Sequence, residues 1–331
     1  MSSALATAGV ILAAWLSFAA VASLAVTLVW RTRDRWLAGM HPRHRAGVAL
    51  AAAAAPSVVP TLLVLACLEP GLAGLAGWHR DHCLSHADHL HLCVVHATAA
   101  LHAPVATILV LAGAAFGAVL GRGIRELVRT RRYVAALRCS AGPALGAGFR
   151  IVASAHPFSL ATGLVRGEIW VSSALVAALS KEELDVVLMH ERAHVERRDP
   201  LRRAAAAALS FPLGPRARRS VLSELALASE QACDEAAARS LGARLRVAEA
   251  ILAAERLAGA AVRSTLAGLP AFGGSAVRRR IASLLEAEPA APALLAPLRI
   301  AFFLAVGALV LVADPLHHAT EHWLHLLLGG R

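Results

Sequence analysis

Residues 180–199 read SKEELDVVLMHERAHVERRD, and this stretch decides the fold of the region around it. On a helix, its spacing places His190 and His194 one turn apart on the same face, with Glu191 beside them. Two imidazoles in this arrangement can hold one metal ion, and the neighbouring glutamate can act as a base toward water. The stretch therefore predicts a metal-binding helix of the HExxH type.

The expected ends of this helix are marked on both sides. Ser180 with Glu183 three residues later is the signature of a capping box, and Asp199-Pro200 indicates a stop. A histidine pair on a helix is more often a packing pair than a ligand pair. Here the clear helix boundaries, and the acidic pair in the next helical stretch, favour the metal site.

A catalytic zinc ion takes three protein ligands and keeps one position open for water. We expect Glu230, in the helical stretch 220–242, to supply the third ligand. Asp234 lies four residues later on the same face, and we expect its carboxylate to hold the free ring nitrogen of a liganding histidine. The expected cofactor is one catalytic Zn²⁺ ion. The expected base is Glu191, which takes a proton from the water that attacks a peptide carbonyl and passes it to the leaving amine.

The composition places this chain among membrane proteins. Of its 331 residues 57% are apolar, and the mean hydropathy of +0.60 is too high for a soluble protein of this length. The net charge of +11 would suggest nucleic acid binding if the arginines formed one patch. They cluster instead beside apolar stretches, where they set membrane topology. We therefore expect the lipid bilayer as a partner and no direct binding of nucleic acid.

Three apolar stretches predict an N-terminal membrane domain over residues 1–120. Their expected boundaries are about 4–30, 47–68 and 98–120, each long enough for the roughly 20 residues that a bilayer requires. Arginines gather between the first two stretches and again after the third, and the positive-inside rule places both clusters in the cytoplasm. The histidine-rich loop 69–97 is then expected on the outer side.

The same rule divides the rest of the chain. Residues 121–292 are expected to form a cytoplasmic zinc metallopeptidase domain, and residues 293–331 a fourth span, at about 298–313, with a short outer tail. The predicted fold class is therefore a multi-pass α-helical membrane protein of about four spans with a cytoplasmic α+β zincin domain. The predicted location is the inner (plasma) membrane of the cell.

A short β-type segment precedes the metal-binding helix. It comprises Glu168, Ile169, Trp170, Val171 and Ser172. We expect it to be the edge strand that zincin folds place beside the metal, where it could hold an extended substrate by adding it to the sheet.

Ligand-type side chains also gather in the regions expected on the outer side. Six histidines would share helix faces there, in two groups: His82, His86 and His89, and His318, His322 and His325. One hypothesis is that they bind Zn²⁺ or Cu²⁺ as a sensing site. The alternative is that histidine supplies neutral polarity in a chain with a single lysine. Cys83 and Cys93 could form a disulfide if their loop faces an oxidising compartment.

The motifs HERAH, RRDPL, SEQACDEAA and VRRRIASLLE, in this order, together resemble the BlaR/MecR-type family of integral membrane zinc metallopeptidases. The resemblance covers roughly residues 150–286. It implies a cytoplasmic gluzincin domain in which His190, His194 and Glu230 hold zinc and Glu191 is the catalytic base. Family members respond to a signal and cleave a cytoplasmic transcriptional repressor, or act with it. The implied partner is therefore a protein substrate such as a BlaI/MecI-like repressor.

Two alternatives are open from the sequence. An HtpX/Ste24-like membrane protein quality-control protease shares HExxH and ExxxD and would degrade membrane proteins broadly. A non-catalytic membrane signalling scaffold would hold zinc only for structure, but a structural site closes with four protein ligands and has no use for Glu191. The large extracellular penicillin-binding sensor domain of the antibiotic-sensing members does not follow the fourth expected span, so sensing of β-lactams by that route is not expected.

Overall fold

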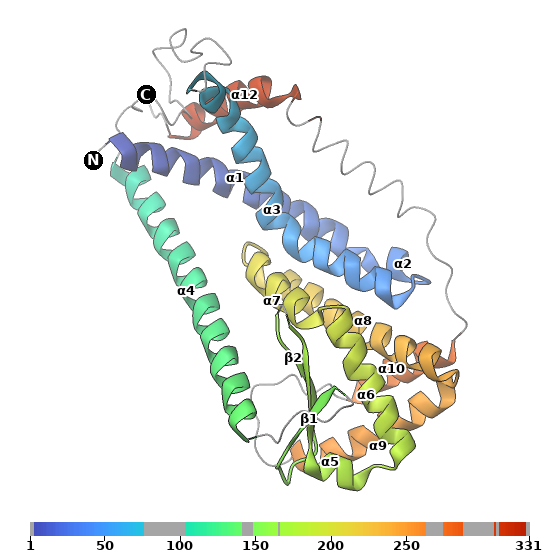
Figure 1. The fold of residues 1–331 in the computed structure, drawn as a ribbon. Coiled ribbons are helices and arrows are strands. Elements are labelled where there is room, and N and C mark those ends of the chain that lie inside the picture. Colours follow the sequence, from blue (N-terminus) through green and yellow to red (C-terminus); the bar gives the residue numbers. More distant parts are fainter. Residues whose placement is uncertain are drawn as a thin grey trace.

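The computed structural model describes residues 3–75, 103–140, 148–164, 166–262, 274–286, 308 and 311–328. Long helices of the N-terminal part occupy one end of the molecule, and a small sheet with its surrounding helices occupies the other (Figure 1). We call the second part, β1 to β3 with α5 to α10, the α+β unit.

The N-terminal part is helical throughout the residues that the structure describes. Its elements are α1 (Ser3–Arg31), α2 (Arg33–Leu37), α3 (Pro42–Leu75) and α4 (Ala103–Ser140), and α12 (Ala313–Leu328) packs against α3 at the far end from the α+β unit (Figure 1). Helices α1 and α3 lie side by side and are joined through α2.

Two of the described helices are long and apolar enough to cross a membrane. They cover Thr7–Arg31 and Pro42–Ala73, with mean hydropathies of 2.2 and 2.1, and they include most of the expected span 4–30 and all of the expected span 47–68. The expected third span, 98–120, falls partly within α4, which continues as one helix to Ser140 and is not among the two. The expected fourth span, 298–313, lies almost entirely outside the described residues.

The α+β unit has a three-stranded sheet and six helices among the residues described. The strands are β1 (Phe149–Val152), β2 (Ser159–Thr162) and β3 (Glu168–Ser172), and the helices are α5 (Ser173–Ala178), α6 (Lys181–Glu196), α7 (Asp199–Leu209), α8 (Pro215–Leu241), α9 (Arg244–Val262) and α10 (Gly274–Leu285). The strand order is β1-β3-β2, with β3 parallel to β1 and antiparallel to β2.

This order corrects one prediction. The segment Glu168, Ile169, Trp170, Val171 and Ser172 is not an edge strand, because β3 has a neighbour on each side. Its apolar centre explains the position: Trp170 and Val171 are fully buried, as expected for a strand that is covered on both faces. The strand beside α6 that has a free edge in the described sheet is β2, whose sequence SLAT is too short and too polar to signal a strand.

The ends of α6 follow the predicted signals. The Ser180 hydroxyl accepts from the Glu183 backbone N–H, and the Glu183 carboxylate accepts from the Ser180 N–H, so the capping box is confirmed. After α6, Arg198 adopts a left-handed conformation with φ of 54° and Pro200 lies in the first turn of α7. This turn brings Asp199 back toward α6.

Helix α8 connects the α+β unit to the N-terminal helices. An apolar cluster lies between them, formed by Trp30, Leu37, Ala46, Ala49 and Ala53 on one side and Ala206, Leu213, Val221, Leu225 and Ala228 on the other. Within it, Arg45 of α3 donates from Nε to Glu224 Oε1 and from Nη1 to Gln231 Oε1, both at 3.0 Å. His41 Nε2 lies 2.6 Å from Glu235 Oε2. The unit is therefore seated on α3 by buried polar contacts as well as by apolar packing.

Replacing Arg45 with alanine should destabilise the protein. Glu224 is only 8% exposed, and its remaining cationic neighbour, Arg279, approaches no closer than 3.7 Å. A buried carboxylate that loses its partner costs about 3–5 kcal/mol, so we expect the free energy of unfolding to fall by about 3 kcal/mol. Urea denaturation in detergent, followed by tryptophan fluorescence, measures the change.

Arg43→Ala is the matched control, because Arg43 is exposed on the same helix two residues away. We expect it to change the free energy of unfolding by less than about 0.5 kcal/mol. Equal effects of the two substitutions would contradict the role of Arg45 in joining α3 to α8.

Candidate metal centre

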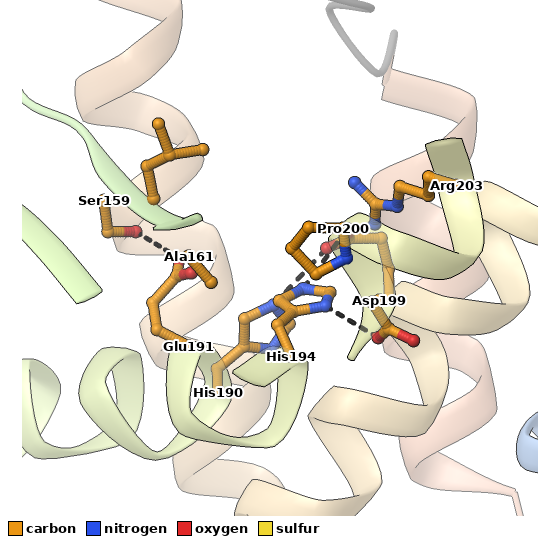
Figure 2. Close-up of a pocket in the computed structure, with 10 residues that line it drawn as sticks. Ser159, Ala161, His190, Glu191, His194, Asp199, Pro200 and Arg203 are labelled. Carbon is orange, nitrogen blue, oxygen red and sulfur yellow. Dashed lines mark hydrogen bonds and ion pairs between the residues drawn. The ribbon is translucent and has the colours of Figure 1, made fainter. Parts of the chain in front are cut away.

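Three ligand-type side chains converge where α6 packs against α8. His190 Nε2 and His194 Nε2 lie 3.1 Å apart, and Figure 2 shows both rings directed into the same cavity. Glu230 places Oε2 3.4 Å from His190 Nε2 and Oε1 3.5 Å from His194 Nε2. The structure thus brings together the three residues that the sequence predicted as ligands.

These separations fit a tetrahedral metal ion. Zinc binds nitrogen and oxygen at about 2.0–2.2 Å, and at tetrahedral angles this puts neighbouring ligand atoms about 3.3–3.6 Å apart. The three observed distances are 3.1, 3.4 and 3.5 Å. Two imidazoles and one carboxylate are also a donor set that suits Zn²⁺, with a fourth position left for water.

Each histidine is held by a buried carboxylate at its other ring nitrogen. Asp234 Oδ1 lies 2.9 Å from His190 Nδ1, and Asp199 Oδ2 lies 2.9 Å from His194 Nδ1. Both carboxylates are almost completely buried. These contacts direct Nε2 of each ring toward the cavity and favour the tautomer that leaves it free as a ligand.

The sequence located Asp234 but missed the function of Asp199. Asp199 was interpreted only as part of the stop signal Asp199-Pro200 after the HExxH helix. An acid five residues beyond His194, just after a sharp turn, was a usable signal, because such a turn directs the side chain back toward the helix it follows.

Arg280 was also missed. It donates two hydrogen bonds to Asp234, from Nε at 2.8 Å and from Nη2 at 2.7 Å, and its side chain is 11% exposed. Cys233 is a third unpredicted neighbour, with Sγ 3.3 Å from His194 Nδ1, on the opposite side of the ring from Nε2. Burial raises the pKa of the Cys233 thiol, so it packs there as a neutral group.

The electrostatics favour positive charge at the point of convergence. Burial alone would lower the pKa of His190, but Asp234 and then Glu230 outweigh it and raise the pKa to about 10. Burial would raise the pKa of Glu230, but the two histidines hold it well below its usual range. A cation placed among these groups therefore meets carboxylates that are already ionised.

Glu191 lies beside this centre in a cavity of about 270 Å³. The cavity is lined by Ser159, Leu160, Ala161, His190, Glu191, His194, Asp199, Pro200, Arg203 and Glu230. Glu191 Oε1 accepts a hydrogen bond of 2.7 Å from Ser159 Oγ. Figure 2 shows Ser159 and Glu191 on one side of the histidines and Pro200 and Arg203 on the other.

The remaining predicted site residues belong to the regions expected on the outer side. His82, His86, His89, Cys83 and Cys93 lie outside the described residues. His318, His322 and His325 lie on α12. In the part of the chain that the structure describes, metal-type ligand atoms converge only in two groups, which share His194. The hypothesis of an outer sensing site stays a prediction.

Residues 152–284 match the family model described as BlaR1 peptidase M56. The matched segment runs from the end of β1 into α10 and contains every residue that lines the cavity. The resemblance predicted from the motifs is thereby confirmed. No curated protein and no solved structure matches the chain significantly.

Removing the charge of either supporting carboxylate should weaken metal binding. We expect Asp199→Asn and Asp234→Asn each to raise the dissociation constant for Zn²⁺ by about 10- to 100-fold. Each substitution removes the carboxylate that fixes the orientation of one histidine ring. Competition with a chromogenic zinc chelator measures this constant. Asp185→Asn is the control, since Asp185 is exposed on the same helix as the histidines. Unchanged affinity in both test variants would show that the carboxylates do not support a metal ligand.

Proposed function

We propose that this protein is a zinc-dependent metalloendopeptidase of the cell membrane, because residues 152–284 match the family model of the BlaR1-type M56 peptidases. Its proposed substrate is a cytoplasmic protein, a BlaI/MecI-like transcriptional repressor, cut in response to a signal. The observation that carries the proposal is the convergence of His190, His194 and Glu230 in the cavity that also holds Glu191.

The side chains present account for the chemistry of peptide hydrolysis. Bound zinc supplies Lewis-acid charge and makes a water molecule more acidic. Glu191 takes one proton from the attacking water, while the oxygen of that water forms a bond to the carbonyl carbon. The C–N bond then breaks, and the same proton passes to the leaving nitrogen. Ser159 holds one oxygen of the Glu191 carboxylate, which fixes its direction and leaves the other oxygen for the proton.

Strand β2 is the proposed binding edge for the substrate. Ser172 N donates to Phe158 O at 2.9 Å, and hydrogen-bonded pairs alternate along an antiparallel ladder. Residues 158, 160 and 162 therefore face β3, while the main-chain groups of Ser159 and Ala161 face the outer edge. These two residues also line the cavity. An extended polypeptide added to this edge would pass directly beside Glu191.

A cytoplasmic position of the α+β unit is supported by its place along α1 and α3. The arginine-rich connection between these helices, residues 31–45, lies at the end of the pair where α8 is seated (Figure 1). Arginines beside a span favour the cytoplasmic side. The proposed substrate is accordingly cytoplasmic or emerges from the inner face of the membrane.

Glu191→Gln should abolish proteolysis and leave the metal in place. The amide cannot accept the proton from water, so we expect cleavage of β-casein by the purified full chain to fall by at least about 1,000-fold. Zinc content, measured by mass spectrometry, should stay at that of the wild type. The control is Glu196→Gln, an exposed glutamate on the same helix. Proteolysis retained in Glu191→Gln would refute the proposed role.

Ala161→Pro should weaken substrate binding through β2. Proline removes the N–H that faces the free edge without removing a bond of the β2–β3 ladder. We expect KM for β-casein to rise by about tenfold, which corresponds to one lost hydrogen bond with a partly buried partner. Ala161→Val, which keeps the N–H, controls for side-chain size. If both variants cleave with the KM of the wild type, the substrate does not bind along this edge.

A further inference from the structure

Hydrolysis of a peptide needs a partner for the carbonyl oxygen as well as a base. When water adds to the carbonyl carbon, the electron pair of the C=O π bond moves to the oxygen, which becomes negative. A fixed donor or cation at that oxygen typically lowers the barrier by several kcal/mol. Glu191 is a carboxylate and would repel the negative oxygen, so it cannot stabilise it. The question is which side chain of the cavity can.

The geometry of the cavity points to α7. Among the ten residues that line it, Arg203 has the one cationic side chain apart from the imidazoles. Arg203 and Glu191 lie on opposite sides of the two histidines (Figure 2). A carbonyl group that enters between them would meet the base on one side and a guanidinium on the other.

Arg203 and Arg280 both contact Glu230, and their surroundings assign them different functions. Arg280 is 11% exposed and its Nε and Nη2 are both bound to Asp234, so it is fixed in place. Arg203 is 42% exposed, and its Nη2 donates to Glu230 Oε1 at 2.6 Å. Once Glu230 serves as a metal ligand, its charge is shared, and it attracts the guanidinium less strongly. Arg203 can then turn toward a substrate, whereas Arg280 cannot.

We propose that Arg203 is a catalytic residue that binds the carbonyl oxygen of the scissile peptide and stabilises the oxyanion formed there. This inference rests on the proposed function. In the addition step, the new C–O bond forms from water, Glu191 receives the proton, and Arg203 donates hydrogen bonds to the negative oxygen. When the C=O bond reforms, the C–N electron pair leaves with nitrogen, which takes the proton from Glu191. Arg203 gains and loses no proton.

The test uses the purified full chain in detergent, loaded with Zn²⁺, as wild type, Arg203→Met and Arg203→Lys. Arg219→Met is the matched control, because Arg219 is an exposed arginine that donates to Pro215 O in the first turn of α8. Three quantities are measured: kcat and KM for β-casein, zinc content, and the dissociation constant of phosphoramidon, whose tetrahedral phosphoryl anion mimics the oxyanion. A short product peptide serves as a probe without such an anion.

For Arg203→Met we expect kcat to fall by about 100-fold with KM within about twofold of wild type, because the guanidinium interacts much more strongly with the oxyanion than with the neutral carbonyl oxygen. Phosphoramidon should bind at least about tenfold more weakly while the affinity of the product peptide is unchanged, and Arg203→Lys should recover part of both losses. Zinc content should equal that of the wild type.

Other outcomes separate this proposal from its premise. If Arg203→Met lowers zinc affinity but keeps kcat per bound zinc and phosphoramidon affinity, Arg203 only supports Glu230 and the proposal is overturned. If the wild type binds zinc and phosphoramidon but cleaves no β-casein, the proposed endopeptidase function fails. The phosphoramidon affinities then decide alone: a tenfold loss supports the role of Arg203, and equal affinities overturn it.

Discussion

The structure depends on the charges that helix α8 buries. Four carboxylates of this helix, Glu224, Glu230, Asp234 and Glu235, are each less than 9% exposed. A buried carboxylate is tolerated only when charged or hydrogen-bonding partners surround it. Those partners include side chains of α3, α6, α7 and α10. The position of α8 therefore determines how α3, the HExxH helix α6 and the basic helix α10 sit relative to one another.

The N-terminal end of α8 lies close to the N-terminal helices. Its N-terminal part and the turn before it reach up along α1 and α3. Ser23 Oγ donates to Pro212 O at 3.1 Å, Ser57 Oγ donates to Leu209 O at 2.5 Å, and Trp15 stacks on Phe211 with ring centroids 5.7 Å apart. These contacts reach as far as Trp15 of α1 and Ser57 of α3, so the α+β unit is seated directly on both candidate spans.

Features that depend on residues close together in the chain were predictable from the sequence, whereas contacts between distant residues were not. His190, Glu191 and His194 were predictable because helical periodicity places the two histidines on one face with the glutamate beside them, and Glu230 was predicted as the third ligand that a catalytic zinc ion requires. The capping box at Ser180 was predictable for the same reason. Arg280 and Arg45 were not, because each meets its partner through contacts more than 40 residues apart in the chain. The prediction that Glu168–Ser172 is the edge strand was wrong. EIWVS is a stronger β signal than SLAT, but a strong β signal in the sequence reflects burial of the strand and not a position at the edge of the sheet.

The candidate metal centre draws its side chains from several helices of the α+β unit. Its two histidines come from α6 and its glutamate from α8, while their supports come from α7 and α8, and Arg280 from α10 holds Asp234. Among the described residues, no fourth side chain joins the three ligand atoms, since Cys233 lies on the Nδ1 side of His194. This geometry favours an open catalytic site over a closed structural one. An ion bound there would link α6 to α8, and at 1,000 times its dissociation constant it would add about 4 kcal/mol to stability. Because that is comparable with the whole stability of a small domain, metal binding and correct placement of α8 are expected to act as one equilibrium.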